Sequence, residues 1–293
     1  SRVAVLDTGR RLYAVPIDGH APAVRVDGQG HHSQDDFQLA PDGSRVVYRS
    51  DPTGRGEIYV VPSDASSAPV RISDPMPVRG DVASFALAPD GTRVVYLADP
   101  AANNRWELFS VPLAGGVPAA RLHSVLDGDR DVIDYRIAAD SQRVVFRGDL
   151  AVDQRVELFS APLDASRAPA RTNGGLVPGG DVLEFQISPD GQRVLYRANQ
   201  EASDVVALYS APIRGGRGTV RLGQALVPGG HVHAFRISAD SSTVAFTAGR
   251  DALGLLTLLV APTSGLGKAS DIARPFPGGG AVLDFALSAD GSV

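Results

Sequence analysis

The chain has 293 residues, of which 43% are hydrophobic and 21% are charged, and this composition excludes disorder and a collagen-like structure. A net charge of −5 without a basic stripe argues against nucleic acid as a partner. No apolar run approaches the roughly 20 residues that a membrane-spanning helix needs, so we expect no membrane insertion. The absence of cysteine excludes disulfides and thiolate chemistry.

The chain begins with residues that are typical of short strands. Ser1–Val5, Leu12–Pro16 and Val24–Val26 predict three strands, and Phe37–Leu39 predicts a fourth. A turn at Asp42 follows. After the turn, the sequence predicts a second set of strands from its β-branched and aromatic residues, at Arg45–Tyr48, Glu57–Val61 and Val70–Ile72. Pro62 ends the strand Glu57–Val61 because proline lacks the amide that a ladder needs.

The same order of strands recurs to the end of the chain. Its marker is an aspartate in a Pro/Ala-Asp-Gly/Ser turn, at spacings of 48 to 50 residues, and the six positions are Asp42, Asp90, Asp140, Asp190, Asp240 and Asp290. We interpret these aspartates as turn formers that bind the local backbone, not as catalysts. Four antiparallel strands in each of six units predict an all-β, six-bladed propeller.

The two ends of the chain are complementary. We call the strand before each turn aspartate, the first of its repeat, the inner strand, and the last strand of the repeat the outer strand. The chain stops just after a sixth inner strand at Phe285–Leu287, and it begins with what resembles a second strand. Pairing of these ends removes the exposed sheet edges that an open array keeps. We therefore predict a single propeller domain over residues 1–293, with a last blade built by strands from both termini.

One repeat carries a family resemblance. The run Phe185–Tyr196, with Ser188-Pro189-Asp190-Gly191 at its turn, and the later run Leu208–Ile213 resemble the repeats of TolB-type propellers. Three repeats depart from the motif, with Ala139, Ala239 and Ala289 in place of the proline. The resemblance implies a bacterial protein-interaction module. Similar repeats also form the propellers that gate prolyl oligopeptidase-like enzymes.

Local signatures of catalysis are absent from the sequence, including the nucleophile elbow, the zinc-binding His-Glu-x-x-His and the phosphate-binding loop. A propeller enzyme can still assemble a site from single residues of several blades. An acidic residue precedes the aromatic residue of four inner strands, at Asp36, Asp134, Glu184 and Asp284. These carboxylates could hold Ca²⁺ at the mouth of the channel. We favour the alternative that they are solvated or pair with arginines such as Arg136 and Arg236.

Two further groups have metal-binding residue types. Asp127, Asp129 and Asp131 have the alternating spacing of a calcium loop, but Ala138 stands where such a loop has its bidentate glutamate. His31 and His32 precede one inner strand, and His231 and His233 precede another, so they could bind a transition metal at one rim. The alternative is that these histidines are simply exposed polar residues.

Trp106, the only tryptophan, lies in a variable loop and is the best candidate for an interface anchor. The leading hypothesis is a non-catalytic, TolB-like binding protein that recognises a protein or peptide through the channel face and loops. A chain that starts at Ser1 without methionine is either a mature exported form or a trimmed one, and its almost exclusive use of arginine over lysine indicates a GC-rich bacterial genome. With the TolB resemblance, we expect a location in the bacterial periplasm or outside the cell. The alternatives are a metal-dependent propeller hydrolase and a structural or assembly subunit. No oligomeric state follows from the sequence.

We expect that deletion of residues 1–26 unfolds or aggregates the whole protein, because it removes three strands and the edge that the last blade needs. Circular dichroism and size-exclusion chromatography of the deletion variant check this. A stable, monomeric variant contradicts the predicted closure.

Overall fold

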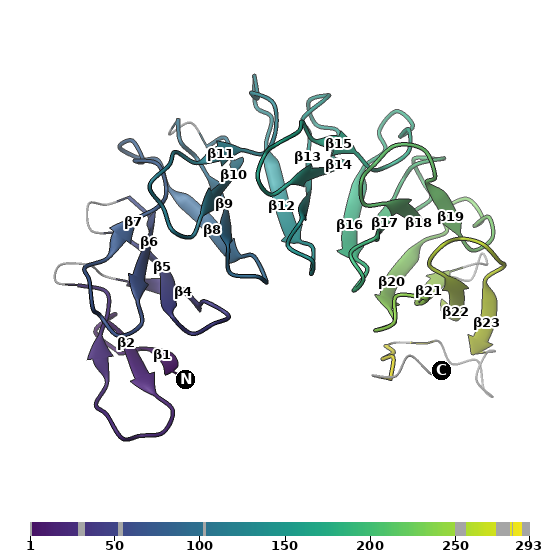
Figure 1. Ribbon diagram of the computed structural model, residues 1–293. Coiled ribbons are helices and arrows are strands. Elements are labelled where there is room, and N and C mark those ends of the chain that lie inside the picture. The colour runs from purple at the N-terminus through teal and green to yellow at the C-terminus, as the bar shows by residue number, and fades with distance from the viewer. Residues whose placement is uncertain are drawn as a thin grey trace. The chain divides into compact units, whose positions relative to one another are not determined.

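The computed structural model describes residues 2–28, 33–51, 55–101, 104–249, 256–273, 282 and 284–288 (Figure 1). All of its regular elements are β-strands, which form five four-stranded sheets and one three-stranded sheet. No helix in these ranges could cross a membrane. The chain divides into two compact units. The first consists of Ser1–Ile137, Ser141–Arg143 and Pro162–Ala168, and the second of Ala138–Asp140, Val144–Ala161 and Pro169–Val293.

The first unit begins with the three-stranded antiparallel sheet. Its strands are β1 (Arg2–Leu6), β2 (Leu12–Pro16) and β3 (Val24–Arg25). Two four-stranded sheets follow, with neighbouring strands paired in chain order. They consist of β4 (Ser33–Leu39), β5 (Arg45–Ser50), β6 (Glu57–Pro62) and β7 (Val70–Arg71), and of β8 (Val82–Leu87), β9 (Arg93–Ala98), β10 (Glu107–Pro112) and β11 (Ala120–Arg121). β12 (Val132–Ile137) ends the continuous part of this unit.

The next strands along the chain are β13 (Arg143–Gly148), β14 (Glu157–Pro162) and β15 (Ala170–Arg171). Two complete sheets of the second unit follow. They consist of β16 (Val182–Ile187), β17 (Arg193–Ala198), β18 (Ala207–Pro212) and β19 (Val220–Leu222), and of β20 (Val232–Ile237), β21 (Thr243–Gly249), β22 (Leu256–Pro262) and β23 (Ser270–Ala273). The predicted all-β class with propeller-type blades is confirmed.

The C-terminal segment differs from the prediction. Residues 284–288, where the sequence predicts a sixth inner strand, form no strand, and no ladder partner for them is found in the described part of the chain. β1 is correspondingly the edge of its sheet, with Val3 and Val5 47% and 43% exposed. The single domain over residues 1–293 and its closure by both termini stay predictions.

The turn aspartates have the predicted role. Asp42 accepts a hydrogen bond from the Ser44 amide at 2.9 Å, and Asp90, Asp190 and Asp240 bind the amide two residues on in the same way. Hydrogen bonds from Ser238 and Ser242 lower the pKa of Asp240 to about 2. The sixth of these residues, Asp290, lies outside the described residues.

Aromatic pairs form the centre of four blades. A ring from the second strand stacks on a ring from the third, with centroids 5.4 to 5.8 Å apart; the pairs are Tyr48–Tyr59, Tyr96–Phe109, Phe146–Phe159 and Tyr196–Tyr209. In the first unit, Leu12 and Ala14 of β2 pack in one cluster with Val46 and Tyr48 of β5. The N-terminal sheet therefore contributes to the core of its unit, which agrees with the effect expected of its deletion.

A polar side chain after the outer strand holds the third strand of several blades. Ser73 accepts the Ile58 amide at 3.1 Å, and Asn173 accepts the Leu158 amide at 2.8 Å. His123 does the same through Nε2, which accepts the Leu108 amide at 3.0 Å, while Nδ1 donates to the Ser124 carbonyl at 2.6 Å. These two bonds require the neutral imidazole with its proton on Nδ1.

His123 makes stability depend on pH. Burial lowers the pKa of His123 from 6.5 to about 4, so the unfolded chain binds its proton more tightly than the folded chain. The free energy of unfolding therefore falls as pH drops from about 6.5 to about 4, by roughly 3 kcal/mol.

The matched variant is His123→Asn, because Asn173 performs the same task in the next repeat. Urea unfolding at pH 7 and pH 4 should show the wild type losing about 3 kcal/mol more than this variant. Equal losses in both proteins contradict the assignment.

Candidate functional site

The acidic residues before the inner-strand aromatics contact arginines of the second strand. Glu184 lies 2.9 Å from Nε of Arg197, its cross-strand neighbour in the β16–β17 ladder. Nη1 of Arg197 then donates to the Val232 carbonyl of β20 at 2.7 Å. In the first unit, Asp36 lies 3.7 Å from Arg49, which donates to the Ala83 carbonyl of β8. Each carboxylate thus orients an arginine that ties its blade to the next.

Two other blades lack both the inner-strand carboxylate and the arginine opposite it. Ser84 stands opposite Leu97, and Ala234 stands opposite Thr247. Arg147 makes the same link as Arg197, since it donates to the Val182 and Leu183 carbonyls of β16. Asp134 holds the equivalent position on β12, whereas Asp284 is exposed and accepts the amide of Phe285 at 2.8 Å. Asp36 and Glu184 are thus parts of blade-to-blade links.

The residue that follows the inner-strand aromatic makes a second link between neighbouring blades. Gln38 donates to the Phe85 carbonyl at 3.2 Å and accepts the Leu87 amide at 2.9 Å. Gln186 donates to the Phe235 carbonyl at 3.1 Å. Arg236 holds this position on β20 and donates to the carbonyl of its neighbour Phe235, and Arg136 holds it on β12. The arginines that bind Asp36 and Glu184 are thus Arg49 and Arg197, not these two.

The proposed calcium loop lies in the first unit. Asp131 accepts the Trp106 amide at 2.6 Å, and Asp127 forms an exposed ion pair with Arg130 at 2.7 Å. Asp129 is exposed and borders a hollow of about 600 Å³, including its open side, together with Asn104, Arg105, Gly128 and Asp131. Within the described ranges, no three metal-binding side chains come together.

The histidine pair lies in the second unit. His231 takes the position that aspartate holds in other inter-blade loops, such as Asp181, which accepts the Val156 amide at 2.8 Å. The rings of His231 and His233 meet edge to face, with centroids 6.3 Å apart. Burial lowers the pKa of His233, and His231 and Arg197 lower it further. Two imidazoles alone provide half of a tetrahedral metal site. His31 and His32 lie outside the described residues.

Trp106 is half-buried and held by its backbone. Its amide donates to Asp131, and its carbonyl accepts the Val132 amide at 2.9 Å. Ile133, the next residue, is 47% exposed, and Val125 on the loop that leads into β12 is 74% exposed. We call Trp106, Val125 and Ile133 the Trp106 surface. Val125 and Ile133 do not stand out in the sequence, because aliphatic residues are typical of a strand and of the loop beside it. The repeat does indicate that Ile133 is exposed, because it aligns with Ala83 and His233, which are also exposed.

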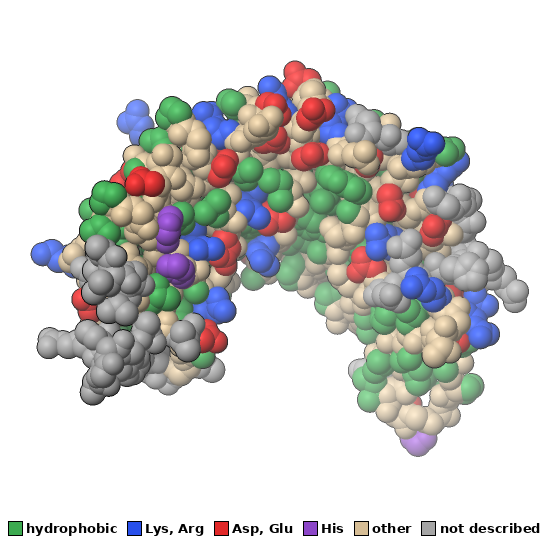
Figure 2. All heavy atoms as spheres, turned by 180° about the vertical axis from the view of Figure 1, so that it is seen from behind, with side chains coloured by type: hydrophobic (Ala, Val, Ile, Leu, Met, Phe, Trp, Pro, Cys, Tyr) green, Lys and Arg blue, Asp and Glu red, His purple; other side chains and the backbone are tan. Residues whose placement is uncertain are grey.

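Charges are mixed on the face shown in Figure 2, where Lys and Arg side chains alternate with Asp and Glu side chains among the described residues. No patch of a single sign gathers on that face. Such a surface offers no broad field for steering a highly charged partner.

No family model matches the chain, and no curated protein matches it in a sequence comparison. The chain does match solved structures. A protein named as a TolB from Agrobacterium tumefaciens is 18% identical, with 75% of this chain and 76% of that chain covered and a TM-score of 0.44. TolB from Acinetobacter baumannii is 16% identical, with 90% and 61% covered and a TM-score of 0.42.

A third solved structure is similar over nearly the whole chain. It is a protein named as a dipeptidyl aminopeptidase IV from Bacteroides ovatus, 13% identical, with a TM-score of 0.62. The match covers 99% of this chain but 46% of that chain, so the chain spans less than half the length of this relative, and less than two thirds of the Acinetobacter TolB. At this identity the likeness supports the propeller fold alone.

Proposed function

We propose that the protein is a non-catalytic binding protein that recognises a protein or peptide partner through loops where the inner strands begin. The observation that carries this proposal is the Trp106 surface: the backbone of half-buried Trp106 is bonded to Asp131, which lines the polar hollow, and to Val132, which precedes the exposed Ile133. We further propose a bacterial periplasmic or extracellular location, which rests on the sequence resemblance to TolB-type repeats.

Single exposed aliphatic residues need no explanation in a soluble protein, but an anchored aromatic residue among them is typical of an interface. Two hydrogen bonds fix the Trp106 backbone to Asp131 and Val132. A partner therefore meets a backbone that is already ordered at this position, which reduces the free energy that binding costs. The exposed carboxylate of Asp129 beside the hollow fits a basic side chain at the rim of the same partner.

The alternative of a metal-dependent hydrolase has weaker support. Two of the four carboxylates proposed to hold the metal, Asp36 and Glu184, contact arginines that bind a neighbouring blade. A cation there must displace a guanidinium and release the link to the next inner strand. Asp36 and Glu184 thus have a structural role, because they contact the arginines that bind the neighbouring blade.

Peptides selected from a random display library against the full chain test the proposal. For these peptides, Trp106→Ala should raise the dissociation constant about tenfold or more, because truncation of an interface anchor costs this much or more. The matched control is Leu266→Ala, which removes a side chain that is 84% exposed on the β22–β23 turn, and it should leave binding within about twofold.

Isothermal titration calorimetry of both variants with the same peptides provides the comparison. Equal binding by Trp106→Ala and the wild type, or loss of binding in Leu266→Ala alone, contradicts the proposed surface.

A further inference from the structure

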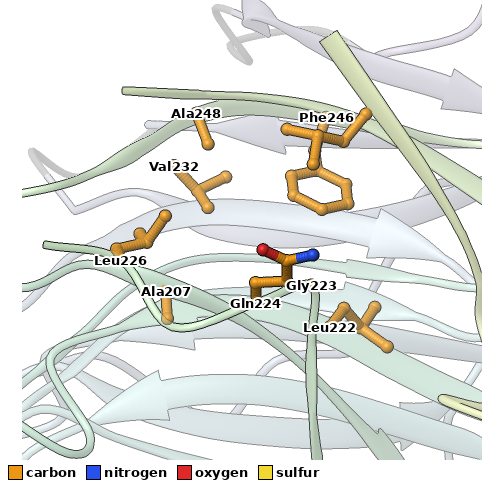
Figure 3. A pocket seen from close by; sticks show the side chains of 9 residues that line it. Ala207, Leu222, Gly223, Gln224, Leu226, Val232, Phe246 and Ala248 are labelled. Atoms are coloured by element: carbon orange, nitrogen blue, oxygen red, sulfur yellow. The ribbon is translucent and has the colours of Figure 1, made fainter. Parts of the chain in front are cut away.

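A buried carboxylate begins the third strand in three consecutive repeats. These glutamates are at most 3% exposed, and each forms an ion pair with the arginine of its outer strand; the pairs are Glu57–Arg71, Glu107–Arg121 and Glu157–Arg171. The next repeat has Ala207 and Gly223 where the glutamate and the polar residue after the outer strand are expected. Apolar side chains such as Phe246 and Leu226 pack around these two small residues and leave room for no more than about one water molecule (Figure 3). Packing therefore compensates for this departure from the repeat.

A second departure follows at His231, and it leaves a polar atom without a bond. In the preceding repeat Asp181 holds this position and accepts the Val156 amide at 2.8 Å. The amide that corresponds to it, of Val206, donates instead to the Gly230 carbonyl at 3.2 Å. Nδ1 of His231 is buried, and no hydrogen-bond partner for it is found among the described residues. The imidazole thus does not take over the structural bond of the aspartate, and a buried nitrogen without a partner indicates a missing ligand.

His233 supplies a second imidazole at the same place. It is the extra residue of a β-bulge between Val232 and Ala234, so the described β20–β21 ladder has no residue opposite it. Its side chain is exposed, and its ring meets the His231 ring edge to face. The aligned residues of the three preceding inner strands are aliphatic; they are Ala83, Ile133 and Leu183. Two imidazoles thus replace an aspartate and an aliphatic residue in one loop.

The separation of the two rings fits a shared metal ion. A metal bonded to an imidazole nitrogen at about 2.1 Å lies about 3.2 Å from the centre of that ring, so two rings that share an ion have centres at most about 6.4 Å apart. The ring centres of His231 and His233 are 6.3 Å apart, which is within this limit. Because His233 is exposed, rotation of its side chain can bring both nitrogens to one ion without movement of the backbone.

The charges around the pair permit a cation. Burial lowers the pKa of His233, and the neighbouring His231 and Arg197 lower it further, so the His233 ring is neutral near pH 7 and keeps a lone pair for a metal. The guanidinium of Arg197 forms an ion pair with Glu184 at 2.9 Å, which offsets its charge. In the described part of the chain no third metal-binding side chain joins the two histidines. An ion here is therefore held by nitrogen ligands alone, with coordination positions left open.

We propose that His231 and His233 chelate one copper(II) ion through one ring nitrogen each. Imidazole suits copper, zinc and nickel, and copper(II) binds most tightly to a given set of such ligands. Water or a group of a second molecule occupies the positions that the two imidazoles leave open. The site lies in the second unit, and it stands independently of the function proposed for the Trp106 surface.

The probe is copper(II), titrated into the full chain at pH 7.5 in a buffer that does not bind metals. Electron paramagnetic resonance at one equivalent should show hyperfine splitting from two imidazole nitrogens. His231→Asn and His233→Leu should each raise the dissociation constant at least about tenfold, because a chelate loses its second attachment. Leucine is the residue that the preceding repeat carries, at Leu183, and asparagine keeps an oxygen that can accept an amide, so both variants should fold.

The matched control is the double variant His31→Asn/His32→Asn, which removes the other two adjacent histidines and should bind copper(II) within about twofold of the wild type. Binding that survives in His231→Asn or His233→Leu, or that is lost in the control, overturns the proposal. A measurement on the wild type decides the matter if a variant fails to fold. Zinc(II) should shift the ring nitrogens of His231 and His233 together in NMR spectra of histidine-labelled protein, and shifts confined to other histidines contradict the assigned site.

Discussion

The ion pair between the first residue of the third strand and the arginine of the outer strand anchors the edge of each blade that carries it. Outer strands β7, β11 and β15 are two residues long, which is too short to be held by ladder hydrogen bonds alone. The buried glutamate and the polar residue that accepts the third-strand amide supply the missing contacts. Where both are absent, β19 extends to three residues and Leu208 pairs with Leu222 in the ladder. The backbone thus compensates for the loss of the side-chain anchor.

Charged side chains also link the inner strands of neighbouring blades. Arg197 and Glu184 face each other across a ladder, and the arginine reaches the carbonyl of the following blade. The carboxylate and the arginine occur together at Asp36 and Glu184 and are both missing at Ser84 and Ala234, so in these blades the pair acts as one structural unit. Residue types that suggest a metal site in the sequence therefore stabilise the contact between neighbouring blades. Functional residues are better sought where the chain departs from its own repeat, as at Trp106.

The strands, the turns and the aromatic layer could be predicted from the sequence because each repeats at a fixed spacing. The role of Glu184 could have been found as well, since the pairing of Phe185 with Tyr196 places Arg197 opposite it. The small cavity beside Ala207 and Gly223 could not, because it depends on how Phe246 and Leu226 pack around these two small residues. The neutral state of His123 also required the structure, since it follows from burial and two hydrogen bonds.

The free energy of unfolding of Glu57→Ala tests most directly whether the buried pair anchors the blade. Removal of this carboxylate leaves the Met76 amide and the Tyr59 hydroxyl without their acceptor and Arg71 without its partner. We expect a loss of about 3 kcal/mol, against less than about 1 kcal/mol for Glu201→Ala, which breaks the exposed pair with Arg221. Equal, small losses in both variants contradict the account, because the outer strand must then be held by contacts other than the buried pair.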